Sequence, residues 1–436
     1  MTSSGRGNFG SRFAVVMALA GSAIGLGNIW RFPYMVGQYG GAAFILIYIL
    51  CLVVIALPIF FAESIIGKST GSDTFGAIEQ IAPGTGWKNA GYIAIVASFV
   101  VLSFYSVVGG WSVDYLLRAC TGGFRFSSGE EAAAVFSQMN SSAVEPILCL
   151  IVFLGLTAVI VSAGVDKGIG RFAKITMPLL FVMILLIVAK SLQLPGAQAG
   201  VDYMLKPDFS KISGKAIAAA LGQAFFTLSL GVGTVLTYSS YMRKEENILY
   251  AGVWSAFFDT VFALLAGFAI MPAVFAFGLA PSAGPSLVFE TLPVIFSQMG
   301  AAVPIIFFIS ILIAALTSSI SMLEVVVAWL VDQKGLSRRA ATIAVFVCAL
   351  ALGSACAISS RVFSACDFLT SNVLMMTGAF VFAIIVGWKM PKADVRTQFT
   401  NYGTSKAARA TFPVVWFLIR WVVPVMIVAI AFTNLF

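Results

Sequence analysis

Histidine is absent from the 436-residue chain, and charged residues make up only 10% of it. The chain therefore has no imidazole to act as the base of a Ser-His-Asp triad or as a metal ligand. Its six cysteines are scattered and show no spacing typical of a metal site. The phosphate-binding sequence GxxxxGK followed by Ser or Thr is also missing, which argues against a P-loop nucleotide pump. No clustered catalytic constellation is visible, so we do not expect an enzyme.

Long apolar runs occupy most of the chain, because 60% of its residues are hydrophobic. A soluble domain carries about 25% charged residues, and a helix of about 20 apolar residues crosses a hydrocarbon core. The composition therefore predicts an all-α membrane protein that crosses the bilayer many times. The first run has no small-residue cleavage site, so we interpret it as a span and not as a signal peptide.

Eleven spans are predicted, at residues 12–37, 41–67, 88–120, 144–163, 167–190, 215–242, 247–277, 300–331, 338–355, 367–389 and 412–435. If the N-terminus lies inside, the inner segments hold 17 lysines and arginines and the outer segments hold seven. This bias predicts a multi-pass protein of the cell inner (plasma) membrane with a cytoplasmic N-terminus. Because the number of spans is odd, the C-terminus would lie outside. Basic inner loops also explain the net charge of +8, so we expect a lipid bilayer as partner and no nucleic acid.

Two of these spans contain a pair of glycines with small polar neighbours. The first holds AGSAIGLGNIWRFPY at 20–34, and the sixth holds FTLSLGVGTVLTYSSY at 226–241. A glycine inside a helix costs about 1 kcal/mol relative to alanine, and unwound backbone within a membrane needs protein or water to satisfy it. Close packing of helices through small residues is one alternative. Two breaks five spans apart, each flanked by Ser, Thr or Asn, favour the binding site of a transporter built from two repeats.

The positions of the two breaks suggest how the chain is organised. A single transporter domain at 1–436 would contain a first repeat at 12–190 and a second repeat at 215–389. The helix at 412–435 would then lie outside the repeat. The two halves show no strong similarity residue by residue, so the positional match of the breaks supports this division.

Several stretches resemble the neurotransmitter:sodium symporters, in the order found in that family: GSAIGLGNIWRFPY at 21–34, GGAAF at 40–44, LPIFFAESIIG at 57–67, FTLSLGVG at 226–233, DTVFALLAGFAIMPAVFAFG at 259–278 and LTSSI at 316–320. Eleven spans without a large second outer loop resemble the bacterial branch, which mostly transports amino acids. The resemblance implies a leucine-transporter-type fold with eleven helices, a 5+5 inverted repeat, and helices 1 and 6 unwound at mid-membrane. It also implies sodium-coupled symport by alternating access.

The resemblance further implies two sodium sites. The first would use the Ala23 carbonyl, the Asn28 side chain, the carbonyl and hydroxyl of Thr227, Asp259 and the substrate carboxylate. The second would use the Gly21, Ile24 and Ala314 carbonyls with the hydroxyls of Thr317 and Ser318. Sodium is a hard cation, and unwound backbone supplies the oxygens it needs. As an alternative, the hydroxyls of 317–319 bond to preceding carbonyls of their own helix.

Twelve residues are expected around the substrate on the same basis: Ala23, Gly25, Leu26, Gly27, Val101, Tyr105, Phe226, Thr227, Ser229, Val232, Ser318 and Met322. Monoamine members of the family carry aspartate at the position of Gly25, and a glycine leaves room for a carboxylate on the ligand. Val232 stands where the leucine transporter has phenylalanine, and Met322 can adapt to several shapes. These features favour a medium or large apolar amino acid. Another small zwitterion or amine, and a substrate-gated channel on the same fold, remain as alternatives.

Gates are expected at both ends of the pathway. Arg31 and Asp367 match the outer pair of the family, and Arg6, Tyr241 and Asp332 match the inner network. An arginine within a span needs a partner or water, which supports Arg31 independently of the resemblance. For Arg6 and Asp332, solvated positions at helix ends are equally consistent with the sequence.

Asp259 replaces the asparagine that most members carry inside the seventh span. Chloride-dependent members also carry a serine four residues later, where this chain has Ala263. We expect Asp259 to act as a built-in counter-charge, so that chloride is not required, although Tyr48 and Gln223, which help to bind chloride elsewhere, are present. Alternatively, Asp259 lines a wet cavity or is protonated, and a protonatable aspartate would be able to export a proton.

Overall fold

The computed structural model describes residues 7–142, 144–279 and 286–435. Helices joined by turns and loops make up this part of the chain, with one isolated antiparallel bridge between Gly41 and Pro207. The helices of the spans are α1 (Arg12–Ala23), α2 (Phe32–Gln38), α3 (Ala42–Cys51), α4 (Leu57–Thr70), α6 (Ala90–Cys120), α8 (Glu145–Ser162), α9 (Arg171–Leu192), α11 (Gly214–Thr227), α12 (Thr234–Ser239), α13 (Ile248–Ala276), α15 (Ala302–Lys334), α16 (Arg338–Ile358), α17 (Ser360–Phe368), α18 (Met375–Ile384), α20 (Lys406–Phe417) and α21 (Val423–Leu435).

Nine continuous stretches of the described chain are long and apolar enough to cross a membrane, and α1 and α2 together form a tenth that is bent by 57°. The predicted sixth span consists of α11 and α12, which are 14 and 6 residues long and are separated by an irregular turn at 228–233. Each of the two is too short to cross alone. The tenth span begins at Ser360 instead of 367, because the Ser359 side chain caps α17 by accepting from the Val362 amide at 3.4 Å.

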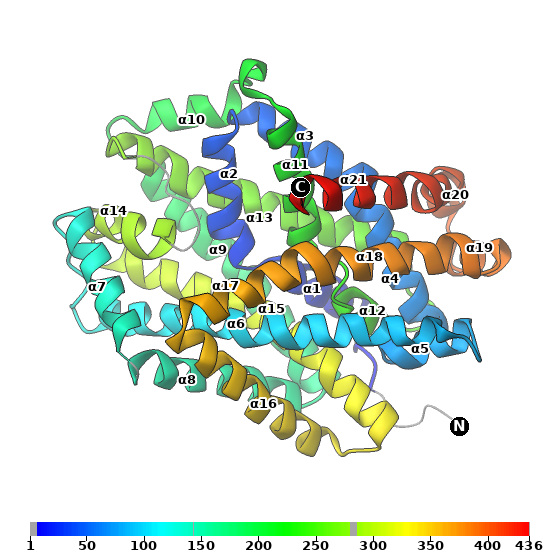
Figure 1. The fold of residues 1–436 in the computed structure, drawn as a ribbon. Helices are drawn as coiled ribbons and strands as arrows, with labels where there is room; N and C mark the ends of the chain where they lie inside the picture. Colours follow the sequence, from blue (N-terminus) through cyan, green and yellow to red (C-terminus); the bar gives the residue numbers. More distant parts are fainter. Residues whose placement is uncertain (1–6, 143, 280–285, 436) are drawn as a thin grey trace.

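Short helices cover both ends of the bundle (Figure 1). At the end shown on the right lie α5 (Thr74–Ile81) and α19 (Lys392–Phe399), and at the opposite end lie α7 (Gly129–Ser141), α10 (Ala197–Leu205) and α14 (Leu292–Gln298). We call these the inner and the outer end, following the distribution of basic residues. The sequence VFETLPVIFSQMG, which follows the Pro/Gly-rich turn APSAGP, predicts a short re-entrant or surface helix within 278–299. The helix α14 occupies this segment, whereas the APSAGP turn falls outside the described residues.

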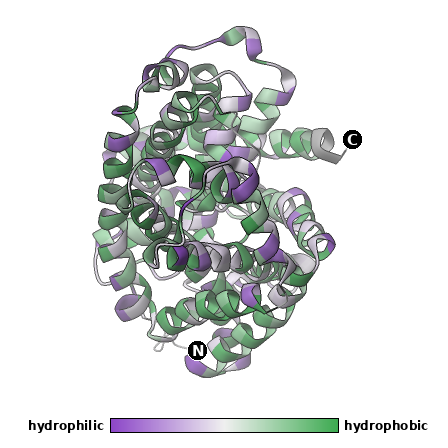
Figure 2. Cartoon of the chain, turned by 90° about the vertical axis from the view of Figure 1, so that its left-hand side faces the viewer, coloured by the Kyte–Doolittle hydropathy of each residue, from purple (hydrophilic) through white to green (hydrophobic). Residues whose placement is uncertain are grey.

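Exposed apolar side chains recur at helical spacing on the flanks of the bundle, as on α8 at Val152, Leu156 and Val159. Figure 2, which views the molecule from the outer end, shows hydrophobic residues along the helices and hydrophilic residues mainly in the connections. Contact of such apolar surfaces with water is unfavourable in free energy, whereas contact with lipid tails is favourable. The surface is therefore that of a multi-pass membrane protein.

Candidate functional site

The first span is broken at its middle. α1 ends at Ala23, and Ile24 adopts an extended conformation with φ −70° and ψ 108°. A π-helical turn then leads into α2. The break leaves carbonyl groups free of the helix, and the Ser22 carbonyl accepts from Ser229 Oγ at 3.0 Å and from Ser318 Oγ at 3.3 Å. The opened backbone therefore meets hydroxyls from two other spans.

The sixth span is broken opposite to it, over residues 228–233. Ser229, Gly231 and Gly233 have φ of 51°, 82° and 78°. Residues other than glycine rarely adopt this positive-φ region of backbone conformation. The Gly231 amide donates to Oε1 of Glu63, which lies in the stretch LPIFFAESIIG of the second span, at 2.7 Å. A Cβ added at Gly231 would lie 1.9 Å from a backbone carbonyl oxygen of α18. This turn thus depends on glycine.

A cavity of about 40 Å³ is enclosed by residues from both breaks. All twelve residues expected around the substrate line it: Ala23, Gly25, Leu26, Gly27, Val101, Tyr105, Phe226, Thr227, Ser229, Val232, Ser318 and Met322. Three more residues complete the wall: Asn28, Phe104 and Met375. Phe104 precedes Tyr105 in the chain, so its place near the substrate could have been inferred from the sequence. No motif marks Met375 in the tenth span.

One side of this central cavity is polar and closely packed. The Leu26 amide donates to Tyr105 Oη at 3.2 Å, and the Gly25 amide donates to Asn28 Oδ1 at 3.1 Å. A Cβ at Gly25 would lie 2.7 Å from Ser318 Oγ and 3.0 Å from Tyr105 Oη. Any larger residue at this position would fill the space between the two hydroxyls.

A fully buried carboxylate lies beside the cavity, on α13. Asp259 Oδ1 accepts from Asn28 Nδ2 at 2.7 Å and from Thr227 Oγ1 at 3.0 Å. Its Oδ2 accepts from Thr227 Oγ1 at 2.9 Å and from Tyr48 Oη at 3.4 Å. The structure thus joins three of the four protein residues expected at the first sodium site, and Ala23 lines the adjacent cavity.

The residues expected at the second sodium site also meet. Thr317 Oγ1 donates to the carbonyl of Ile24 at 3.4 Å and to that of Ala314 at 3.0 Å, and Ser318 Oγ donates to the Ile24 carbonyl at 3.4 Å. A Cβ at Gly21 would lie 3.3 Å from Thr317 Cβ. The hydroxyl of Thr317 therefore bonds both to a carbonyl of its own helix, α15, and to a carbonyl of the opened first span. The sequence had offered these two kinds of hydrogen bond as alternatives.

A larger cavity of about 350 Å³, here called the vestibule, adjoins the central cavity and shares four lining residues with it: Leu26, Phe104, Tyr105 and Phe226. Arg31 and Asp367 both line the vestibule. The Arg31 guanidinium lies 4.8 Å from the centroid of the Phe226 ring, and Asp367 Oδ1 accepts from Ser371 Oγ at 3.1 Å. Among the described ion pairs, none joins Arg31 to Asp367, so the expected gate partners face one space without touching.

At the inner end, Tyr241 Oη donates to Glu324 Oε1 at 2.6 Å. The Arg338 guanidinium binds both oxygens of the same carboxylate and also donates to a carbonyl of α8 at 2.8 Å. Asp332 Oδ2 accepts from the backbone amide that precedes α5, at 3.1 Å. Arg6 falls outside the described residues. No motif in the sequence predicts this pairing of Glu324 with Arg338.

Phe9 packs in an aromatic cluster with Tyr238 and with Tyr241 of the inner network. Phe9, which replaces the tryptophan of many family members, is fully buried. Its ring centroid lies 5.6 Å from that of Tyr238 and 6.2 Å from that of Tyr241, both in edge-to-face contact. The phenylalanine thus occupies a packed position despite its smaller size.

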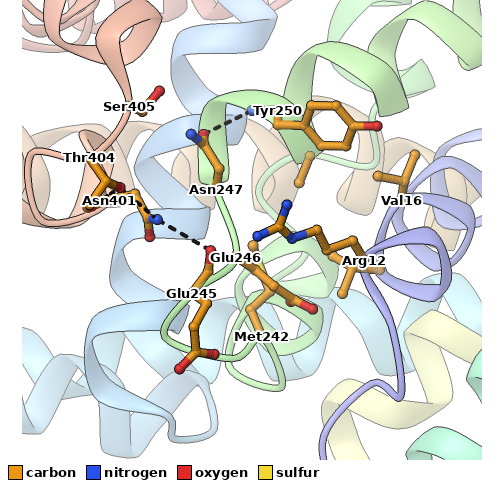
Figure 3. Close-up of a pocket in the computed structure, with 12 residues that line it drawn as sticks. Arg12, Val16, Met242, Glu245, Glu246, Asn247, Tyr250, Asn401, Thr404 and Ser405 are labelled. Atoms are coloured by element: carbon orange, nitrogen blue, oxygen red, sulfur yellow. Dashed lines mark hydrogen bonds between the residues drawn. The ribbon is translucent and has the colours of Figure 1, made fainter.

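A separate cavity of about 400 Å³ opens at the inner end, between the start of α1, the segment before α13 and the loop at 401–405 (Figure 3). In Figure 3 Arg12 points into it, and Asn401 Nδ2 donates to the Glu245 carbonyl at 3.2 Å. Burial raises the pKa of Glu246, which lines this space. The inner cavity shares no lining residue with the central cavity, so we keep it apart from the candidate site.

Comparison with known proteins agrees with these arrangements. The model of the sodium:neurotransmitter symporter family matches residues 6–135 and 133–436. An uncharacterised sodium-dependent transporter of Bacillus subtilis is 38% identical over 440 residues, covering 98% of this chain and 96% of its own. Another of Haemophilus influenzae is 36% identical over 458 residues, covering 99% and 98%.

Among solved structures, the crystal structure of MhsT in complex with L-phenylalanine superposes with a TM-score of 0.90 at 38% identity, covering 99% of this chain and 100% of that one. This likeness confirms the predicted leucine-transporter-type fold. Together with the family match, it shows that the chain belongs to the sodium:neurotransmitter symporter family, and that it is a sodium-dependent transporter and not an enzyme.

Proposed function

We propose that this transporter imports a medium or large apolar amino acid together with sodium, by alternating access. The observation that carries the proposal is the two-sided central cavity. Gly25, Tyr105 and the backbone of the first break form its polar side, and Val101, Val232 and Met322 contribute apolar surface. An α-carboxylate suits the first side and an alkyl or aromatic side chain suits the second. The phenylalanine bound to MhsT, a relative in structure and sequence, supports this class of ligand.

The carboxylate of the substrate would lie against the start of the second half of the first span. The amides at the N-terminus of a half-helix carry partial positive charge and favour an anionic group. Tyr105 Oη is already within hydrogen-bond distance of the Leu26 amide there. Phe226, which lines both cavities, would cover the bound ligand as a lid.

Two sodium ions would bind beside the substrate. The first would take oxygens from Ala23, Asn28, Thr227 and Asp259, and the second from Gly21, Ile24, Ala314, Thr317 and Ser318. The hydrogen bonds among these groups support the proposal, because they bring oxygen-bearing side chains to opened backbone carbonyls. Since the substrate carboxylate would complete the first site, sodium and substrate would bind cooperatively.

Chloride would not be required, because Asp259 supplies the negative charge. Two sodium ions and a zwitterion bring net positive charge into a buried site, and an anion must offset it. Tyr48 Oη, which helps to bind chloride in other members, donates to Asp259. Ala263, one helical turn further along α13, offers no hydroxyl to an anion.

Alternating access would use the gates at the two ends. Closure of the outer gate would bring Asp367 to Arg31 across the vestibule. Opening of the inner end would separate the groups around Tyr241, Asp332 and Arg6. The basic residues of the inner segments support a cytoplasmic N-terminus and an outer C-terminus.

A binding screen of the twenty amino acids, with and without sodium, tests the proposal. We expect tight, sodium-dependent binding of apolar members, measured by scintillation proximity or calorimetry on the purified protein. Binding that ignores sodium would contradict it, and preference for an amine without a carboxylate would support the alternative of an amine transporter. A current far larger than the counted substrate flux would support a substrate-gated channel.

A further inference from the structure

Two cysteines face each other at the outer end of the bundle. Cys356 lies near the end of α16 and Cys366 lies in α17, ten residues later. The chain turns at Ser359 between the two helices, and this turn brings the sulfur atoms to within 3.8 Å of each other. That distance is van der Waals contact between two thiols that the structure records as free.

The two thiols differ in how exposed they are. Cys356 is only 3% exposed, whereas Cys366 is partly exposed. An external reagent would therefore reach Cys366 first, and Cys356 would be placed to react second. An exposed attacking thiol beside a buried resolving thiol is a common arrangement in redox-sensitive pairs.

The pair lies on the vestibule side of the protein. Phe363 and Asp367, which line the vestibule, flank Cys366 on α17. Arg338, at the opposite end of α16, belongs to the inner network. With the proposed orientation, the cysteines face the outer compartment, where disulfides form and persist, and not the reducing cytosol.

We propose that Cys356 and Cys366 form a reversible disulfide that tethers α17 to α16. The Cys366 thiolate attacks an external protein or small-molecule disulfide and releases one thiol. The Cys356 thiolate then attacks the mixed disulfide at Cys366 and releases the second thiol. The two protein thiols lose two protons and two electrons in total, and the external disulfide is reduced to two thiols.

The consequence of the tether concerns the outer gate. α16 packs against α6 and α8, and α17 carries Asp367. Closure of the gate requires Asp367 to approach Arg31. A disulfide that fixes α17 to α16 would hold Asp367 back and slow the transport cycle. This step rests on the proposed function, whereas formation of the disulfide does not.

Peptide mapping of the full-length protein tests the pairing. Trypsin cuts after Arg339, Arg361 and Lys389, so Cys356 and Cys366 fall on the separate peptides 340–361 and 362–389. Cys348 shares the first peptide and is replaced by Cys348→Ser beforehand. After treatment with oxidised glutathione, we expect the two peptides to be linked, two hydrogen atoms lighter than their sum, and separated again by dithiothreitol. A glutathione adduct on Cys366 without linkage would overturn the proposal.

Uptake in proteoliposomes tests the tether. We expect oxidation to lower the sodium-dependent uptake rate severalfold and dithiothreitol to restore it. Cys356→Ser and Cys366→Ser should each abolish this sensitivity, and Cys120→Ser, at an exposed cysteine of the same end, should retain it. Linked peptides with unchanged uptake would refute the effect on the gate. Absence of all uptake in the reduced protein would count against the proposed function and leave the mass measurement to decide the pairing.

Discussion

Single atoms around Asp259 determine the electrostatics of the candidate site. Its carboxylate accepts from three neutral donors, Asn28, Thr227 and Tyr48, all of them buried. These donors stabilise a negative charge without cancelling it. The sequence was sufficient to identify Asp259 as unusual, because its position within a family motif is occupied by asparagine in most members. The sequence also named the three donors, Asn28 and Thr227 at the first sodium site and Tyr48 as a residue that helps to bind chloride elsewhere, and the folded chain shows which carboxylate oxygen each one contacts.

Replacing chloride by gluconate should leave sodium-driven uptake unchanged, because in the proposed mechanism Asp259 supplies the counter-charge. Asp259→Asn should lower uptake by about tenfold or more, equal to about 1.4 kcal/mol or more. In the double variant Asp259→Asn/Ala263→Ser, uptake should recover in part, and only when chloride is present. Collapse of wild-type uptake in gluconate would refute the built-in counter-charge.

Asn28→Ala should weaken sodium and substrate binding together, since one side chain serves both. Hydrogen bonds to charged groups contribute about 1.5–3 kcal/mol, so we expect both dissociation constants to rise by about tenfold or more. Asn89→Ala, at an exposed asparagine, provides the matched control. A loss of substrate affinity with unchanged sodium affinity would mean that the two do not share this residue.

At the scale of the elements, the two broken spans and the helices that support them form the site. The glycine pairs predicted the breaks, because glycine tolerates both the positive φ and the close approach that the turn at 228–233 requires. Side-chain contacts between distant spans were harder to predict. Met375 reaches the central cavity and Arg338 reaches Glu324 at the inner end, both from helices without a recognisable motif, and only packing brings them there.

Gly231→Ala should destabilise the turn of the sixth span, because its Cβ would collide with a carbonyl of α18 and its φ is 82°. The positive φ alone costs about 1–2 kcal/mol. Gly155→Ala, in α8, is the control because a Cβ there meets no other atom. Unfolding followed by fluorescence-detected chromatography should show a lower midpoint for Gly231→Ala only. Equal midpoints would argue that the turn relaxes.

Arg338→Ala should destabilise the inner end of α15 and α16, because it leaves the buried carboxylate of Glu324 without its cation. Breaking a buried ion pair on one side costs about 3–5 kcal/mol. The double variant Glu324→Gln/Arg338→Ala should recover part of this loss, since the amide removes the buried charge and still accepts from Tyr241. If the double variant unfolds as readily as the single one, the unpaired charge of Glu324 is not the cause of the loss of stability.

For the whole molecule, the sequence predicted the number of spans and the fold type, because span length and apolar composition are set by the bilayer. The interrupted sixth span shows the limit of this reasoning. Its two halves fail a length criterion separately, so a criterion of helix length misses a crossing that the apolar run at 215–242 and its glycine pair predict.

The orientation of the chain is open to direct measurement. Cys120 is exposed at the outer end of α6, and Thr404 is exposed in the inner loop before α20. A membrane-impermeant maleimide should label Cys120 in intact cells. In a Cys120→Ser/Cys366→Ser background, which removes both cysteines accessible from the outer end, Thr404→Cys should be labelled only after the cells are permeabilised. Labelling of Thr404→Cys in intact cells would reverse the proposed orientation.

The unequal cavities on the two sides of the central site have an electrical consequence. The vestibule of about 350 Å³ shares four lining residues with the site, whereas the cavity at the inner end shares none with it. Water in the vestibule conducts, so most of the membrane potential would fall across the packed inner half. A sodium ion arriving from outside would therefore cross little of the field, which is worth about 2.3 kcal/mol per charge for 100 mV. The voltage dependence of the cycle should then reside in the steps that move charge through the inner half, and not in ion capture.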